Sequence, residues 1–227
     1  MNTQVKNIDG QVGEGMDFER IRRITGYLVG TLDRFNDAKR AEVEDRVKHG
    51  LRRMAPLPTD HLRLCGTEPE SIVDGPGFRF VVFTQGCPHH CPGCHNPQSH
   101  PFEGGYEVSV EELFQAVAEN PHLAGVTFSG GEPFCQPGAL AQLGRRVKSL
   151  GKTVMTYTGY TLEQLQEMDD PQVKELLEVT DILVDGRYEE SLRDLTLLFR
   201  GSENQRVIDM NKTRQAGKMI LFDLDYI

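Results

Sequence analysis

The sequence predicts an α/β fold: a partial (β/α) barrel of about five to six parallel strands, with a small N-terminal appendage of one loop and one helix. Three observations predict it: alternating strand and helix patterns, the chain length, and a change of charge along the chain. The chain has 227 residues, 38% of them hydrophobic and 26% charged. This length suits one core and is too short for two large catalytic domains.

Short β-rich runs alternate with helical patterns from residue 79 onward. The predicted strands lie at residues 79–84, 125–129, 153–157, 181–185 and 205–209, and the predicted helices at 109–120, 137–150 and 162–179. Ser109 and Glu112 match a capping box at the start of the first of these helices. Right-handed βα crossovers build a parallel sheet whose ligands gather at the carboxyl ends of the strands.

The N-terminal part differs in charge from the rest of the chain. Residues 1–53 hold 11 Lys or Arg and 9 Asp or Glu, whereas the whole chain has a net charge of −9. We therefore expect three parts: a segment at 1–50 with a short helix ending near residue 49, a linker at 51–62 that contains Pro56 and Pro58, and a main domain at 63–227.

The charge and the apolar runs exclude two classes of partner. The excess of acidic residues argues against a nucleic-acid surface, which needs clustered Lys and Arg. The apolar runs are far shorter than the roughly 18 residues of a membrane span, and residues 1–20 contain no signal-like segment. We expect a cytoplasmic protein that binds neither nucleic acid nor a membrane.

Three of the five cysteines lie within one short loop, Gly86-Cys87-Pro-His-His-Cys91-Pro-Gly-Cys94. An odd number of cysteines without an export signal disfavours a disulfide framework. Three thiolates at this spacing can converge on one soft metal centre, such as a [4Fe–4S] cluster with one iron left open. The alternative is a structural zinc site that uses the three cysteines and one of the neighbouring histidines, His89, His90 or His95.

A second motif stands at the end of the next predicted strand, Ser129-Gly130-Gly131-Glu132-Pro133. Two adjacent glycines expose backbone N–H and C=O groups to a closely approaching ligand, and Glu132 is suited to orienting a cationic ammonium group. A zinc site does not require this motif, so its presence favours the cluster.

Together, the cysteine loop and the Gly-Gly-Glu-Pro strand end resemble the radical S-adenosylmethionine superfamily. The resemblance implies that Cys87, Cys91 and Cys94 hold a [4Fe–4S] cluster whose open iron binds the amino and carboxylate groups of S-adenosylmethionine. It also implies reductive cleavage of that cosubstrate to methionine and a 5′-deoxyadenosyl radical, with the protein supplying placement and exclusion of water.

Further stretches at residues 71–79, 157–160, 183–188 and 199–206 resemble the activating enzymes of glycyl-radical enzymes. They are most similar to those of anaerobic ribonucleoside-triphosphate reductase, and the likeness covers about residues 60–215. It implies the reductase catalytic subunit as partner and a flavodoxin-like reductant. Tyr157, Thr158 and Asp185 end predicted strands, where they can contact S-adenosylmethionine; turn-forming or capping roles are the alternatives.

Residues 23–27 resemble a glycyl-radical loop, and residues 21–49 resemble the carboxyl-terminal tail of the reductase catalytic subunit. In this interpretation Gly26 is the substrate residue, because flanking amide and carbonyl groups stabilise a radical at its Cα. The alternative is a glycine in a surface turn. Residues 1–20 lack the cysteines of the zinc ribbon that precedes the family tail. The chain therefore resembles an activase joined to its own target segment, as a natural fusion or a constructed chimera.

Three functions remain open from the sequence. The first is an oxidoreductase that installs a glycyl radical on the reductase or on the N-terminal segment of this chain. The second is a radical S-adenosylmethionine enzyme that acts on another peptide or a small molecule, and the third is a zinc-stabilised interaction module. Cys65 and Cys135 are too few to hold another three-cysteine cluster.

Overall fold

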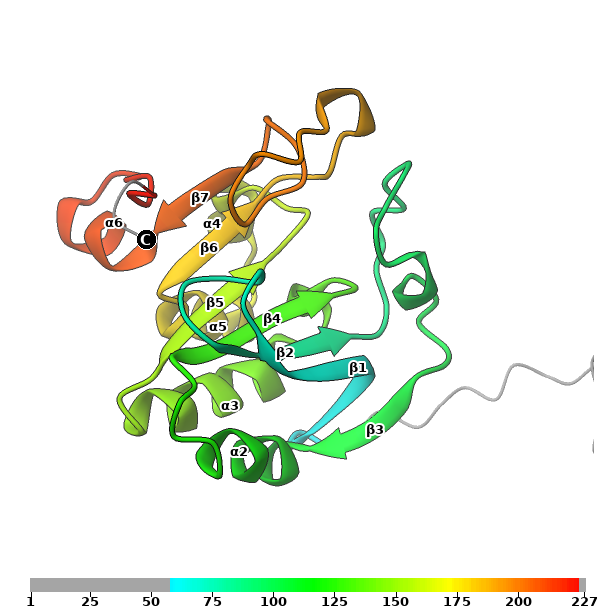
Figure 1. Ribbon diagram of the computed structural model, residues 1–227, viewed down its shortest axis with the longest axis vertical. Coiled ribbons are helices and arrows are strands. Elements are labelled where there is room, and N and C mark those ends of the chain that lie inside the picture. The colour runs from blue at the N-terminus through cyan, green and yellow to red at the C-terminus, as the bar shows by residue number, and fades with distance from the viewer. Residues whose placement is uncertain (1–57, 225–227) are drawn as a thin grey trace, which may run out of the picture. The chain divides into compact units, whose positions relative to one another are not determined.

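The computed structural model describes residues 58–224, which contain one seven-stranded sheet with the order β3-β1-β2-β4-β5-β6-β7 (Figure 1). The strands are β1 His61–Ser71, β2 Arg79–Thr84, β3 Tyr106–Ser109, β4 Gly125–Gly130, β5 Thr153–Tyr157, β6 Ile182–Asp185 and β7 Arg206–Asp209. Strands β2, β4, β5 and β6 are parallel, and β1, β3 and β7 run antiparallel to their neighbours. The two end strands, β3 and β7, are not paired with each other, so the sheet is open.

The predicted α/β class with a mainly parallel core is confirmed, but the parallel strands number four rather than five or six. The run at 205–209 forms β7, which pairs antiparallel with β6 because the chain returns through a long loop instead of a helical crossover. Strands β1 and β3 were not predicted. The first begins at His61, inside the segment expected to be a linker.

The helices of the described residues are α2 Val110–Ala118, α3 Pro137–Ser149, α4 Leu162–Glu167, α5 Pro171–Val179 and α6 Met210–Ala216. The capping box at the start of α2 is confirmed, because Ser109 and Glu112 each accept a hydrogen bond from the other's backbone N–H. The single helix predicted over 162–179 is two helices, since Pro171 starts a new one and Asp170 caps it.

The two faces of the sheet are covered differently. Helices α2, α3, α4 and α5 pack on one face and share the larger hydrophobic core with it (Figure 1). Alternate residues of β5, β6 and β7 form a smaller cluster on the other face, made of Met155, Ile182, Val184 and Val207. Loops rather than helices cover this second face: a Cβ added to Gly75 of the β1–β2 loop would lie 2.6 Å from the Met155 sulfur.

A buried arginine ties together the amino ends of three parallel strands. Arg79 in β2 is 0% exposed. It donates from Nε to Thr127 Oγ1 at 3.1 Å, from Nη1 to Thr153 Oγ1 at 2.6 Å and from Nη2 to the Val126 carbonyl at 2.5 Å. Burial lowers the pKa of Arg79 to about 10. The groups that accept hydrogen bonds from the Arg79 guanidinium are neutral hydroxyl and carbonyl oxygens of β4 and β5.

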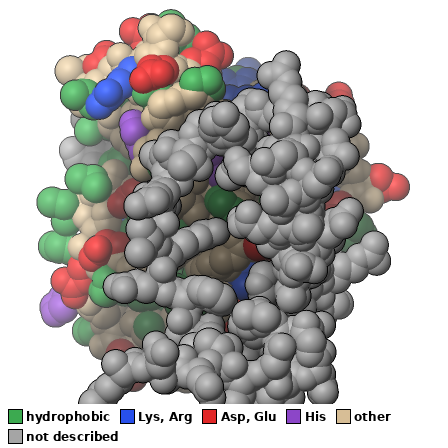
Figure 2. Space-filling view, turned by 90° about the vertical axis from the view of Figure 1, so that its right-hand side faces the viewer, with side chains coloured by type: hydrophobic (Ala, Val, Ile, Leu, Met, Phe, Trp, Pro, Cys, Tyr) green, Lys and Arg blue, Asp and Glu red, His purple; other side chains and the backbone are tan. Residues whose placement is uncertain are grey.

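On the face shown in Figure 2, the described residues present acidic, basic and hydrophobic side chains side by side. Within residues 58–224, no helix is both long enough and apolar enough to span a membrane.

Candidate metal centre

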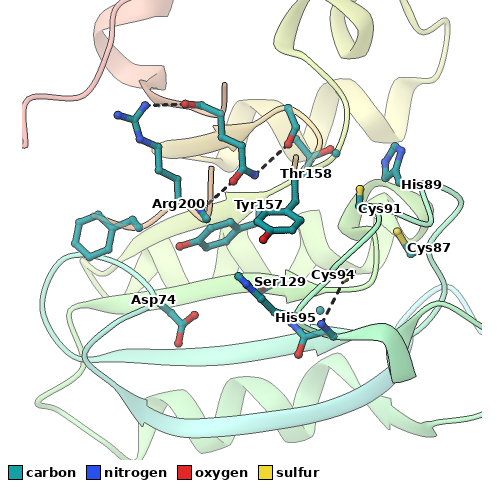
Figure 3. A pocket seen from close by; sticks show the side chains of 18 of the residues that line it. Asp74, Cys87, His89, Cys91, Cys94, His95, Ser129, Tyr157, Thr158 and Arg200 are labelled. Atoms are coloured by element: carbon teal, nitrogen blue, oxygen red, sulfur yellow. Dashed lines mark hydrogen bonds between the residues drawn. The ribbon is translucent and has the colours of Figure 1, made fainter. Parts of the chain in front are cut away.

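A cavity of about 680 Å³ lies at the carboxyl ends of β2, β4, β5 and β6, on the loop-covered face of the sheet. Its wall includes the following predicted site residues: Cys87, Cys91, Cys94, Gly130, Gly131, Tyr157 and Thr158. Figure 3 shows side chains of the cysteine loop and of the β5 end turned toward this space. The structure thus brings together seven residues from three separate stretches of sequence.

The cysteine loop follows β2 and is held by backbone hydrogen bonds. Gly86 N–H donates to the Ser99 carbonyl at 2.8 Å, and Cys87 N–H donates to the His100 carbonyl at 3.0 Å. All three loop thiols are free. Burial raises the pKa of the Cys87 and Cys91 thiols. Their thiolate forms therefore need a positively charged partner, which a metal centre provides.

The donor chemistry of this loop fits an iron–sulfur cluster. Within residues 58–224, no three His, Cys, Asp or Glu side chains are grouped closely enough to hold a single metal ion. The three thiols nevertheless border one cavity, and thiolates are the ligands that iron–sulfur clusters use. A four-iron cluster is larger than one ion, so its ligands stand farther apart.

The two glycines after β4 allow close packing of backbone against backbone. A Cβ on Gly131 would lie 2.4 Å from the Gly86 carbonyl oxygen, and one on Gly130 would lie 2.6 Å from the Phe83 backbone. Gly131 N–H also donates to the Thr84 carbonyl at 2.8 Å. The end of β4 is therefore pressed directly against the residues that lead into the cysteine loop.

Glu132 lies behind the cavity wall rather than in it. Its side chain is 0% exposed and accepts hydrogen bonds from Phe134 N–H at 3.0 Å, Thr158 Oγ1 at 3.0 Å, Gly159 N–H at 2.9 Å and His89 Nε2 at 2.7 Å. A direct contact with an ammonium group, as the sequence suggested, would require these bonds to rearrange.

Asp185 is also withdrawn from the cavity. Its carboxylate is buried and accepts from Leu162 N–H at 2.7 Å and from Arg206 Nε at 2.9 Å. It therefore caps the start of α4 and anchors β7, which is the alternative role that the sequence left open. Tyr157 lines the cavity, and burial raises the pKa of its hydroxyl. Gly26 and the rest of the N-terminal segment lie outside the described residues.

Sequence reasoning missed several residues of the cavity wall, including Asp74 and Arg200. Both belong to stretches that carried the family resemblance, but no spacing rule placed them at the site. His89 was considered only as a zinc ligand, whereas its ring hydrogen-bonds Glu132. Arg200 follows Phe199, a non-glycine residue with a φ of 58°. The Arg200 side chain donates from Nη1 to the Gln205 carbonyl at 2.7 Å.

Three free thiols that border one cavity at the carboxyl ends of the parallel strands are the donor set of an iron–sulfur protein. Residues 73–208 match the family model described as a 4Fe-4S single cluster domain, which covers more than half of the chain. The chain belongs to this family and, within it, to the anaerobic ribonucleoside-triphosphate reductase-activating proteins. This confirms the predicted family and favours a cluster over zinc.

Three relatives illustrate the similarity. The activating protein of Salmonella typhimurium is 33% identical over 147 residues, which are 61% of this chain and 93% of that one. The Vibrio cholerae protein is 36% identical over 145 residues, covering 60% and 91% of the two chains. The protein of Enterobacteria phage T4 is 32% identical over 146 residues, covering 61% and 88%.

The N-terminal segment has a separate similarity. Residues 11–49 match the family model of anaerobic ribonucleoside-triphosphate reductase itself, as the sequence predicted. Among solved structures, QueE from Escherichia coli has a TM-score of 0.37 and 15% identity, over 53% of this chain and 68% of that chain.

Proposed function

We propose that this chain is a radical S-adenosylmethionine enzyme that installs a glycyl radical on anaerobic ribonucleoside-triphosphate reductase or on Gly26 of its own N-terminal segment. The observation that carries the proposal is the cavity in which three free thiols of one loop face the ends of β4 and β5. Membership in the activating-protein family supports it. A flavodoxin-like reductant and a cytoplasmic location follow from the same proposal.

Each part of the cavity has a role in this proposal. Cys87, Cys91 and Cys94 are the ligands of the cluster, which when bound and reduced supplies the electron for cleaving S-adenosylmethionine. The backbone at Gly130 and Gly131, with Tyr157 and Thr158, borders the space next to these thiols and is the proposed surface for the cosubstrate. Glu132 and Asp185 support this surface from behind, because their carboxylates are occupied by protein donors.

Apolar side chains at the cavity mouth give the chain a means to exclude water. Val73, Leu195, Leu197 and Phe199 line the cavity from the two loops that cover the sheet face. Excluding water protects a reactive radical from side reactions. Hydrogen transfer also needs the glycine Cα close to the radical carbon, so the substrate loop has to enter this mouth.

The N-terminal segment is the proposed substrate in cis or within a dimer. Residues 11–49 match the reductase, and Gly26 lies within that match, in the stretch 23–27 whose sequence resembles a glycyl-radical loop. A tethered segment has an effective concentration on the order of millimolar, so it can compete with a separate reductase even when it binds weakly.

Electron paramagnetic resonance tests the proposal. The full chain, reconstituted anaerobically and reduced with S-adenosylmethionine, is expected to give a glycyl doublet that collapses when the protein carries deuterated glycine. The doublet disappears in Gly26→Ala while methionine release continues. Methionine release without any doublet would leave the cleavage function intact and place the target on another protein. An unchanged doublet in Gly26→Ala would exclude Gly26.

A further inference from the structure

We propose that His89 and Glu132 form a buried clamp that fixes the cysteine loop to the ends of β4 and β5, so that Glu132 is a positioning residue for the cluster site and does not contact the cosubstrate. The proposal rests on the function proposed above only in calling the thiols cluster ligands. The clamp is a single contact between His89 Nε2 and Glu132 Oε2 at 2.7 Å. Both side chains are buried, with exposed fractions of 4% and 0%.

The hydrogen-bond geometry leaves Glu132 no capacity for another partner. A carboxylate offers about four lone-pair positions. Oε1 accepts from Phe134 N–H and Thr158 Oγ1, and Oε2 accepts from Gly159 N–H and His89 Nε2. A buried carboxylate is costly unless it is hydrogen-bonded in this way. All four positions are filled by protein donors, so an ammonium group would have to displace one.

Packing around His89 is shaped to hold the ring in place. A Cβ on Gly159 would lie 2.4 Å from His89 Cδ2, so only glycine leaves room for the imidazole. The Tyr160 ring meets it edge to face, with the ring centroids 4.5 Å apart. His89 Nδ1 is buried and has no hydrogen-bond partner among the described residues. The bond to Glu132 is therefore the polar contact that fixes this ring.

The position of His89 in the chain links the clamp to the thiols. It stands between Cys87 and Cys91, and the next residue, His90, has a φ of 49°. A non-glycine residue in this region is strained, and such strain persists where the surroundings enforce it. The chain thus turns sharply at this point, and His89 reaches Glu132 from a loop whose flanking cysteines, Cys87 and Cys91, border the same cavity. Breaking the bond frees the loop and leaves the cosubstrate surface in place.

The test measures how fast the reconstituted full chain loses its cluster absorbance to an excess of a ferrous-iron chelator. His89→Phe keeps an aromatic ring but cannot donate, and it is expected to shorten the half-time about tenfold, because the buried Glu132 carboxylate loses one of its donors. His89→Gln, whose amide can donate to Glu132, is expected to recover part of the loss. His90→Asn is the matched control in the same loop and is expected to leave the half-time unchanged.

A second arm measures binding of S-adenosylmethionine to protein that has retained its cluster. His89→Phe is expected to bind within about twofold of the wild type, because the bonds of Glu132 to Thr158 and Gly159 remain. Much weaker binding in His89→Phe would overturn the proposal, and so would an unchanged half-time in that variant. If the wild type binds no S-adenosylmethionine, the proposed function fails. The half-times of cluster loss to the chelator still test whether the His89–Glu132 contact holds the cysteine loop.

Circular dichroism of the apoproteins shows whether the variants fold. Should His89→Phe not fold, Gly159→Ala displaces the same ring without removing a polar group. It is then expected to shorten the half-time, and an unchanged half-time would again contradict the clamp.

Discussion

The two ends of the parallel strands each bury a charge, and the two charges are held in different ways. At the amino ends, Arg79 is bonded to neutral oxygens of β4 and β5. At the carboxyl ends, Glu132 is bonded to donors from the cysteine loop, the β5 end and its own turn. The first network joins strands that are already paired, and the second joins segments that no strand pairing holds.

We therefore expect the buried charge at the amino ends to contribute mainly to stability, and the one at the carboxyl ends mainly to the geometry of the site. Removing the charge at the amino ends should weaken the sheet and leave the site intact in folded molecules. Changing the carboxyl ends should disturb the site more than the sheet. The following experiments test that separation, in order of decreasing effect.

The largest effect is expected from the loop thiols. Cys91→Ala should abolish iron binding almost completely, because three thiolates are the proposed ligands of the cluster. Iron content and visible absorbance after anaerobic reconstitution measure this. Cys65→Ala and Cys135→Ala are controls outside the cavity wall and should retain both. A full cluster in Cys91→Ala would contradict the ligand assignment.

Arg79→Met should lower the free energy of unfolding by about 2–4 kcal/mol, because it leaves buried hydroxyl and carbonyl oxygens of β4 and β5 without a donor. Urea unfolding of the apoprotein measures the loss. Iron bound per folded molecule should remain at the wild-type value. If iron binding falls while stability does not, the separation of the two strand ends is wrong.

Gly131→Ala should cost about 1–3 kcal/mol, because the added methyl meets the backbone of Gly86 and cannot be accommodated by a side-chain rotation. Cluster retention should fall as well, since Gly86 precedes Cys87. Gly66→Ala in β1 is the matched control: no atom lies within 4 Å of its added Cβ. Equal effects of the two substitutions on both measurements would refute the close-packing argument.

The smallest effect concerns Glu163 in α4. Its hydrogen bond with Arg206 lowers the pKa of Glu163 to about 2 from an ordinary 4.5. The carboxylate therefore stabilises the fold above about pH 4.5, and this contribution is lost as the pH falls toward 2. The Glu163 side chain is 56% exposed and that of Arg206 is 29% exposed, so solvent screening limits the pair to about 1 kcal/mol at most.

Unfolding of wild type and Glu163→Gln should therefore differ at pH 6 and converge near pH 2–3. A difference that grows as the pH falls would contradict this assignment. Iron binding should be the same in both proteins, because this ion pair does not line the cavity.

The sequence predicts many of the strands and helices correctly, because local residue patterns determine where these elements begin and end. The limits of β2 and β5 were predicted correctly, since β-branched and aromatic runs stand between turn residues. The direction of β7 was not predictable, because side-chain alternation is the same for parallel and antiparallel strands. Strand β1 carried a signal that was overlooked, the alternation of Leu62 and Leu64 with polar residues.

The site was predictable at the level of motifs and not of contacts. The three cysteines and both glycines reach the cavity wall because their spacing and backbone freedom act locally. Glu132 and Asp185 do not, because their partners, such as His89 and Arg206, come from distant parts of the chain. A motif identifies which residue is needed, whereas the folded chain decides which atom it touches.

The clamp also has a consequence for the order in which the protein is made. Synthesis proceeds from the N-terminus, so the cysteine loop leaves the ribosome before Glu132, and Glu132 leaves before Thr158 and Gly159. The Glu132 carboxylate gains its full set of donors only after Thr158 and Gly159, which follow β5, have been synthesised. Iron delivered earlier would meet three thiols on a loop whose clamp is incomplete. We therefore expect cluster insertion to follow the synthesis of β5.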